Sequence, residues 1–295
     1  MFVSAIESVA QFTRPLHIIS RNFESHAVLP GAATLFFVNP DAWALTCGHV
    51  ADQIVAMDTL NDRYREYRRE LQEMRSPNRD VRRKLEKKYG YSPKMTVQIR
   101  ARFIGCGTGD FNIEVRRHAS HDIALLHFSF SGENSAKAIS LFPKFAANGD
   151  DLKQGKYLCR LGFPFPEFTN FAYSLAADDI DWTTEGKEQT PRFPIDGMMT
   201  RHVVDTSGAV VGFEMSTPGL RGQSGGPCFD TDGKIWGMQS MTRHLDLDFD
   251  VDQMVLRQGV KERRRDSAFL HVGNCVHVNV LKAFMRDHHV KFSEA

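Results

Sequence analysis

The spacing of apolar residues divides this chain into strand-like and helix-like stretches. Residues 32–38 (AATLFFV) and 42–50 (AWALTCGHV) are short apolar runs separated by Asn39-Pro40-Asp41. Two such runs around turn residues predict a pair of strands. From about residue 53 to 89, Tyr, Leu and Met instead recur on one helical face amid Arg, Glu and Lys, with a break at 76–78. This stretch predicts a charged helical hairpin inserted between strands.

The remaining segments have the pattern of half-buried strands. Residues 95–106 and 111–130 alternate between apolar and polar positions, and glycines at 105, 107 and 109 separate the two segments. Further short runs at 156–163, 202–215 and 228–241 include the turn pairs Ser207-Gly208 and Asp232-Gly233. Residues 276–290 have the pattern of a strand followed by a C-terminal helix. Many short strands with turns between them favour a barrel or a sandwich over a parallel α/β sheet.

Charge and hydropathy exclude several classes of partner. The 295 residues include 37 Lys and Arg against 36 Asp and Glu, so the formal net charge is +1. This balance gives no field that draws the whole molecule to nucleic acid. No apolar run approaches the roughly 20 residues that span a bilayer, and the N-terminus lacks the regions of a secretory signal. We therefore expect no membrane anchor, no nucleic-acid partner and a cytoplasmic location.

The five cysteines are odd in number and widely scattered, at positions 47, 106, 159, 228 and 275. They lack the C-x-x-C spacing of zinc and redox sites, and reduced thiols fit an intracellular compartment. We predict no metal site and no cofactor.

The strongest chemical signal is the stretch Gly222-Gln223-Ser224-Gly225-Gly226-Pro227. Small residues around a serine let backbone N–H groups point at a site beside its hydroxyl, which is what an acyl-transfer oxyanion requires. The Gly222 and Ser224 amides are the predicted donors. A serine hydroxyl also needs an imidazole to take its proton, and the imidazole needs a carboxylate to orient it.

Candidates for both groups lie upstream of the serine. His49 lies at the end of an early strand in LTCGHV, and Asp122 precedes an apolar strand in HDIALLHF. The order His, Asp, Ser with these contexts resembles the chymotrypsin-like (trypsin-like) serine peptidase family, and in particular its bacterial stand-alone members. Residues 161–164 (LGFP) also resemble a strand end of that family. The resemblance covers roughly residues 28–285.

The resemblance implies a mainly β fold of two packed six-stranded β-barrels with catalysis in the cleft between them. We accordingly expect an N-terminal extension (1–27) and a first barrel (28–148) that carries His49, Asp122 and the helical insert (about 53–90). A second barrel (149–295) then carries Ser224 and the C-terminal helix. The implied activity is that of a serine endopeptidase, which cleaves protein or peptide substrates through an acyl-enzyme.

The resemblance also indicates where a substrate binds. Ser240 is expected to offer main-chain groups to an extended peptide, and we add Thr242, His244 and Arg221 as candidate substrate-binding residues. Gln223 replaces the aspartate that secreted digestive enzymes use for activation. The base of the specificity pocket falls near Pro218 and Gly219, with no acidic residue that selects Lys or Arg.

Other interpretations remain open from the sequence alone. A catalytically idle peptidase-fold scaffold would use the cleft or the insert to hold a partner, and a protein partner at the insert is also compatible with an active enzyme. The pattern G-x-S-x-G also fits the nucleophile elbow of an esterase, which needs a helix after the serine, with His271 and Asp246 as base and acid. Four aspartates alternate along one segment, at positions 246, 248, 250 and 252, which places them on one face of a strand. This face is either exposed to solvent or an acidic subsite that attracts basic residues of the substrate.

Overall fold

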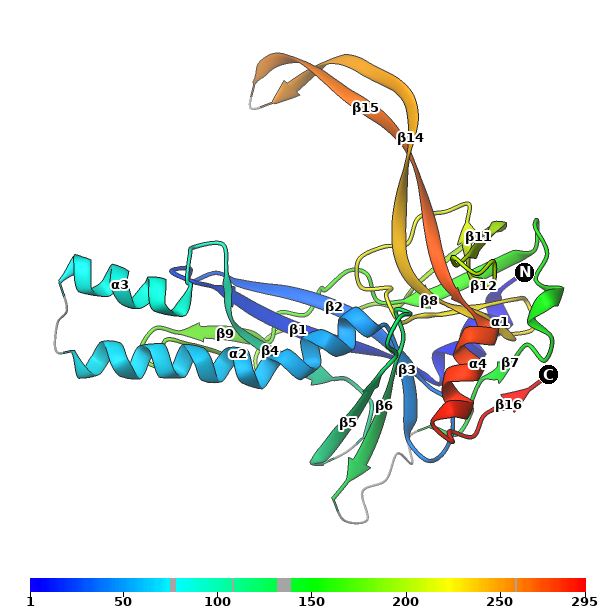
Figure 1. The fold of residues 1–295 in the computed structure, drawn as a ribbon, viewed down its shortest axis with the longest axis horizontal. Coiled ribbons are helices and arrows are strands. Elements are labelled where there is room, and N and C mark those ends of the chain that lie inside the picture. Colours follow the sequence, from blue (N-terminus) through cyan, green and yellow to red (C-terminus); the bar gives the residue numbers. More distant parts are fainter. Residues whose placement is uncertain (75–77, 108, 132–138, 258) are drawn as a thin grey trace.

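The computed structural model describes residues 1–74, 78–107, 109–131, 139–257 and 259–295. Two antiparallel sheets form its body, and two long hairpins project from that body, one helical and one made of strands (Figure 1). The fold is mainly β, as the sequence predicts, and it includes the predicted helical hairpin and C-terminal helix. Within the described residues, no helix is both long enough and apolar enough to cross a membrane.

The first sheet carries the segments around His49 and Asp122. Its strand order is β4-β1-β2-β3-β6-β5, and every pairing is antiparallel. The strands are β1 (Thr13–Asn22), β2 (Val28–Phe37), β3 (Trp43–Thr46), β4 (Thr96–Phe103), β5 (Phe111–Arg117) and β6 (Ala124–Phe130). Among the described residues no pairing joins β4 to β5, so this six-stranded sheet is an open half-barrel and not the closed barrel expected.

The second sheet closes on itself. Six of its strands follow the order β13-β8-β11-β12-β15-β14, and an additional pairing between β13 and β14 completes the ring. They are β8 (Tyr157–Gly162), β11 (Phe193–Val204), β12 (Val210–Met215), β13 (Pro227–Phe229), β14 (Ile235–Arg257) and β15 (Val260–His277). The short strands β7 (Lys144–Phe145) and β16 (Ser293–Glu294) extend the sheet in parallel. A separate hairpin pairs β9 (Phe171–Ser174) with β10 (Asp179–Trp182).

The chain ends differ from the expected organisation. Helix α1 (Val3–Ala10) leads into β1, which lies between β2 and β4. Residues 13–22 are therefore part of the first sheet and not of an N-terminal extension. Strand β7, expected in the first half, adds to the second sheet. Helix α4 (Val278–Asp287) follows β15, and His277 caps it by accepting a hydrogen bond from the Asn279 amide.

One apolar core joins the two sheets. Phe36 and Leu125 of the first sheet and Phe213 and Phe229 of the second are fully buried in the same cluster. Burial of this kind is the dominant favourable term in folding. This shared core fixes the two sheets relative to each other. It therefore also fixes the distances between side chains that segments of the two sheets contribute to one site.

Helix α2 (Gly48–Glu73) and helix α3 (Arg79–Tyr89) form the helical hairpin, which has a small aromatic core of its own. Phe23, the residue after β1, contacts the rings of Tyr67 and Tyr91 at centroid distances of 5.6 and 5.1 Å. Asn61 of α2 also exchanges two hydrogen bonds with the backbone of Ile99 in β4. The hairpin is thus packed along the first sheet and not simply solvated.

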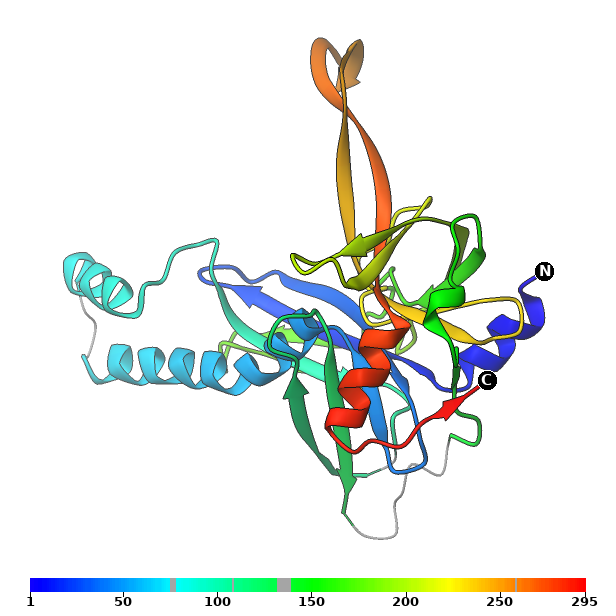
Figure 2. The same cartoon turned by 45° about the vertical axis from the view of Figure 1, so that its right-hand side comes forward.

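The outer parts of β14 and β15 form a two-stranded arm that extends well beyond the body (Figures 1 and 2). Its register shifts between Asp246 and Asp250, where Asp248 has a φ of 55°. This bulge breaks the single acidic face that the alternation predicted. Beyond it, Asp250 and Asp252 pair with Arg265 and Arg263 of β15.

Candidate active site

Two consecutive turns shape the loop around Ser224. The Gln223 amide donates to the Leu220 carbonyl at 3.0 Å, and the Gly226 amide donates to the Gln223 carbonyl at 2.8 Å. The third residue of each turn is a glycine with positive φ, 94° at Gly222 and 87° at Gly225. This pattern is typical of type II turns, in which glycine is favoured at the third position. Ser224 is the second residue of the second turn, so its side chain projects from a corner of the loop.

Close packing against β2 and against the residue after β8 fixes the same loop. A Cβ on Gly225 would lie 2.1 Å from the Thr34 carbonyl oxygen, and one on Gly222 would lie 2.4 Å from the Phe163 carbonyl oxygen. The Thr34 hydroxyl also donates to the Gly222 carbonyl at 2.7 Å. Glycine is therefore required at these positions both for conformation and for space. The loop is held as a rigid unit by a residue of β2.

His49 occupies the first turn of a helix, although the sequence placed it at a strand end. Strand β3 ends at Thr46, Cys47 is the helix N-cap, and α2 begins at Gly48. The His49 amide donates to Asp122 Oδ1 at 2.9 Å, and His49 Nδ1 lies 2.9 Å from Asp122 Oδ2. An ionised carboxylate only accepts, so Nδ1 carries the hydrogen. A neutral imidazole in this tautomer leaves Nε2 free to accept a proton.

Several hydrogen bonds hold Asp122 in its ionised form. Burial raises the pKa of the Asp122 carboxyl, but hydrogen bonds from the His49 ring, the Ser240 hydroxyl and the His49 amide outweigh burial and bring the pKa well below its ordinary value. The Ser240 hydroxyl donates to Oδ2 at 2.5 Å. Ser240 lies where the β14–β15 register shifts between Gln239 and Met241. Such a bulge redirects a side chain, and here the Ser240 hydroxyl reaches Asp122.

Ser224 and His49 line one hollow of about 550 Å3. The Ser224 hydroxyl donates to the Ser240 carbonyl oxygen at 3.1 Å, and no hydrogen bond joins it to His49 within the described part of the chain. All four candidate substrate-binding residues, Ser240, Thr242, His244 and Arg221, line this hollow too. The Thr242 hydroxyl donates to the Gly219 carbonyl at 2.6 Å, which ties two walls of the hollow together.

The family model of the trypsin-like peptidase domain matches residues 33–238, which are more than half of the chain. The chain belongs to the trypsin-like peptidase domain family. No curated protein matches it. Among solved structures, it is similar to an HtrA-type protease, AlgW, with a decapeptide, at 10% identity and a TM-score of 0.49. It is also similar to a variant of that protease with a tripeptide, at 10% identity and a TM-score of 0.47. The alignments cover 97% of this chain and 67% and 63% of those chains.

The trypsin-like domain is incompatible with the esterase interpretation of G-x-S-x-G. A nucleophile elbow continues into a helix, whereas the chain after Ser224 enters strand β13 (Pro227–Phe229), which pairs with β8 and β14. His271, the base in that interpretation, lines the hollow but contacts His244 through their Nδ1 atoms. The elbow prediction is therefore wrong.

One group of side chains in this domain has the composition of a metal site. It consists of Cys47, His49 and Asp122, whose possible ligand atoms all lie within 4.8 Å of one another. His49 Nδ1, however, already bonds to the Asp122 carboxylate. Burial raises the pKa of the Cys47 thiol well above its usual range, with a further contribution from Asp122, and the thiol donates to the Gln239 carbonyl at 3.2 Å. The arrangement is that of a hydrogen-bonded histidine and carboxylate packed against a neutral thiol.

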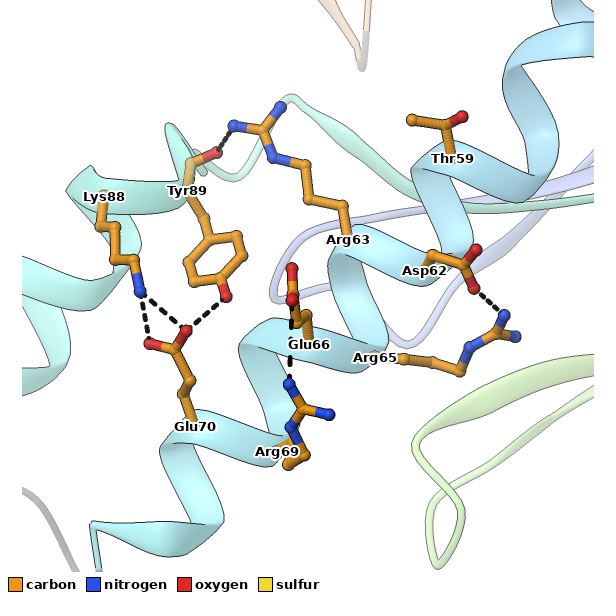
Figure 3. A pocket seen from close by; sticks show the side chains of 9 residues that line it. All are labelled: Thr59, Asp62, Arg63, Arg65, Glu66, Arg69, Glu70, Lys88 and Tyr89. Carbon is orange, nitrogen blue, oxygen red and sulfur yellow. Dashed lines mark hydrogen bonds and ion pairs between the residues drawn. The ribbon is translucent and has the colours of Figure 1, made fainter.

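A second hollow, of about 980 Å3, lies between α2 and α3 and is lined mostly by charged residues (Figure 3). These charges pair with one another. Glu70 accepts from Lys88 and from the Tyr89 hydroxyl, and Arg69 pairs with Glu66 (Figure 3). The Arg63 guanidinium donates to the Tyr89 carbonyl at 2.7 Å. This mutual pairing gives no support to a binding site here, and a protein partner at the insert stays a prediction.

Sequence reasoning missed two residues that shape the hollow of the trypsin-like domain. Gln239, one position before Ser240, lines the hollow, and Arg160 lies fully buried behind it. Arg160 NH1 donates to Gln239 Oε1 at 2.7 Å. The available signal was an arginine inside the otherwise apolar run at 157–163, because a charged residue there is rarely buried without a partner.

Proposed function

We propose that the chain is a serine endopeptidase in which Ser224 is the nucleophile, His49 its general base and Asp122 the carboxylate that orients the base. One observation carries the proposal above all: His49 is bonded to Asp122 through Nδ1 at 2.9 Å while it lines the same hollow as Ser224. Membership of the trypsin-like peptidase domain family supports it further.

The proposed chemistry follows from which atoms are free. Nδ1 of His49 donates to Asp122, so Nε2 is available to take the Ser224 proton. In the proposed reaction, the Ser224 hydroxyl exchanges its hydrogen bond to the Ser240 carbonyl for one to that nitrogen. Oγ then bonds to the carbonyl carbon of the substrate, and His49 passes the proton to the leaving amine as the C–N bond breaks. Water releases the acyl group with His49 again as the base, and Ser224 regains its hydrogen.

The oxyanion formed in each step needs backbone donors. Among the described residues, neither the Gly222 nor the Ser224 amide donates to a protein acceptor. Both belong to the rigid glycine loop, so they are available at no cost in reorganisation. Removal of one such donor raises the barrier by about 3–4 kcal/mol in enzymes of this kind.

Labelling with a fluorophosphonate probe tests the proposal. We expect the parent to be labelled and Ser224→Ala to remain unlabelled, with Ser129→Ala, at an exposed position of β6, as a control that keeps the proposed nucleophile. Cleavage of a denatured protein mixture should stop in the same Ser224→Ala variant. Equal labelling of parent and Ser224→Ala would refute the assignment.

One observation favours a second candidate, a catalytically idle scaffold that holds peptides in the hollow. The Ser224 hydroxyl is bonded to Ser240 and not to His49. In that case, a folded parent would show neither labelling nor cleavage but would still bind peptides, and Ser224→Ala would bind them equally well.

A cytoplasmic location and a protein partner for the helical hairpin accompany this proposal as expectations. All five cysteines are free and buried, which fits a reducing compartment. Cell fractionation with an antibody against the chain tests the location. Pull-down with parent and with a variant carrying charge reversals on the exposed face of α3 tests the partner.

A further inference from the structure

The lining of the hollow beside Ser224 has one fixed charge, and that charge is positive. The residues that line it include His49, Arg221, His244 and His271, and no Asp or Glu is among them. The Arg221 side chain is exposed, and within the described residues its guanidinium has no ion pair. A cationic group that lines a hollow without a carboxylate partner is available to a ligand.

A second guanidinium lies directly behind the wall of the hollow. Arg160 is 0% exposed. Its NH2 donates to the Thr217 carbonyl at 3.0 Å, to the Thr217 hydroxyl at 2.6 Å and to the Pro218 carbonyl at 3.2 Å. Its NH1 donates to Gln239 Oε1 at 2.7 Å. Every one of these acceptors is neutral.

The fold makes a dedicated space for this charge. A Cβ at Gly273 would lie 2.0 Å from Arg160 NH1, so glycine is needed there to accommodate the guanidinium. A buried cation with no anionic partner is costly. The buried carboxylate of Glu214 does not balance it, because Glu214 pairs with both Arg201 and Arg243.

Gln239 and Pro218 connect this buried charge to the hollow. Both residues line the hollow, and both accept a hydrogen bond from Arg160. A hydrogen bond from a cation polarises the acceptor group, and the polarised Gln239 amide donates through Nε2 to the Met241 carbonyl at 2.8 Å. Arg160 and Arg221 thus place two positive charges at the wall of the hollow, against the one negative charge of Asp122, which is already bonded to His49 and Ser240.

We propose that this hollow takes a carboxylate side chain, so that the substrates are peptides with Glu or Asp immediately before the cleaved bond. The proposal rests on the proposed peptidase function. Arg221 is assigned to direct contact with the substrate carboxylate. Arg160 is a positioning residue, which acts through Gln239 and the backbone of the Pro218 loop.

Matched peptides test this assignment. Fluorogenic peptides that differ only in the residue before the cut should be cleaved with Glu at least tenfold more efficiently than with Gln, in terms of kcat/KM, and with Lys least of all. Glu and Gln have the same shape, so their ratio reports charge alone. Cleavage with Gln or Lys equal to or better than with Glu would overturn the inference and leave the proposed function intact. No cleavage, together with no Ser224-dependent fluorophosphonate labelling, would overturn both.

Variants of the two arginines then test which charge causes the preference for Glu over Gln. Arg221→Gln and Arg160→Met should each lower the Glu-to-Gln ratio toward one, whereas Arg79→Gln, an exposed arginine on α3, should not change it. A purely structural role of Arg160 predicts an equal loss for both peptides and so an unchanged ratio, which would overturn its assignment. If Arg160→Met does not fold, Arg160→Lys replaces it, because Lys keeps the charge but not the fork of donors. A retained ratio in a folded Arg160→Lys then supports the charge, and a ratio of one contradicts it.

Discussion

Ser240 bonds to Asp122 through its hydroxyl, which donates to Oδ2 at 2.5 Å. The same residue accepts from the Ser224 hydroxyl through its carbonyl oxygen, at 3.1 Å. Ser240 therefore contacts both the carboxylate and the nucleophile of the proposed triad. A single bulge residue of β14 couples the loop before β6 of the first sheet to the loop before β13 of the second.

Ser240→Ala removes one of the hydrogen bonds that keep Asp122 ionised and oriented. A hydrogen bond to a charged group contributes about 1.5–3 kcal/mol, so we expect the rate of fluorophosphonate labelling to fall roughly tenfold to a hundredfold, at about 1.4 kcal/mol per factor of ten. The carbonyl of residue 240 stays in place. Ser129→Ala, on the exposed side of β6, is the control and should label at the parent rate. Parent-like labelling of Ser240→Ala would show that the contact does not orient Asp122.

Two glycines with similar backbone angles separate strain from crowding. Gly208 has a φ of 84° and open space within 4 Å of the point that a Cβ would occupy, whereas Gly225 has a φ of 87° and the Thr34 carbonyl oxygen 2.1 Å from that point. Gly208→Ala should cost about 1 kcal/mol of unfolding free energy and keep full labelling. Gly225→Ala should cost clearly more and abolish labelling, because the loop must move away from β2. Equal unfolding free energies for the two variants, measured by urea denaturation, would contradict this explanation.

The residues of the proposed site stand out in the sequence more clearly than their surroundings do. His49, Asp122 and Ser224 each have a distinctive local context, and local context depends on near neighbours alone. The structure bonds His49 to Asp122 and places His49 and Ser224 on one hollow, whereas their catalytic roles stay a proposal. Arg160 was missed because its role depends on Gln239 and Pro218, which lie 79 and 58 residues away in the sequence. No periodicity reports contacts at such separations.

The same limit applies to the arm formed by β14 and β15. Alternation at residues 245–252 correctly indicated a strand, but the bulge at Asp248 depends on the register against β15. The pairing of Asp252 with Arg263 likewise requires knowing that the two segments fold back on each other. Strand type was therefore predictable, whereas register and the extent of the arm were not.

His277 makes the stability of the fold sensitive to mild acid. Burial, together with nearby His202, lowers the pKa of His277 to about 4, against an ordinary value of 6.5. Between these two values the unfolded chain binds a proton that the folded chain does not, so the free energy of unfolding falls as pH falls, by up to about 1.4 kcal/mol per pH unit. His17, whose pKa is also lowered to about 4 by burial and by Arg102, adds to the effect.

His277→Asn keeps a side chain that can cap α4 but removes the titration. We expect its melting temperature to depend less on pH than that of the parent between pH 6.5 and 4, with the contribution of His17 remaining. His289→Asn, at an exposed position after α4, serves as the control and should follow the parent. Parallel melting curves for His277→Asn and the parent would contradict the assignment of this pH dependence to His277.

Tyr67 separates the stability of the helical hairpin from the proposed active site. Its ring is buried among Phe23, Tyr89 and Tyr91, at centroid distances of 5.6, 5.6 and 5.2 Å. Tyr67→Ala should destabilise the packing of α3 by about 3–5 kcal/mol, seen as faster amide hydrogen exchange in residues 79–89. His49 lies 18 residues earlier on α2, roughly 27 Å at the helical rise, so labelling of Ser224 should not change.

The Tyr67 hydroxyl provides the matched control for this prediction. It is buried and has no hydrogen-bond partner among the described residues. An unpaired buried polar group costs about 1–3 kcal/mol, so Tyr67→Phe should leave the hairpin as stable as in the parent or more stable, with unchanged exchange in α3. A loss of Ser224 labelling in Tyr67→Ala but not in Tyr67→Phe would mean that the order of the hairpin reaches the first turn of α2, and that the insert controls the position of His49.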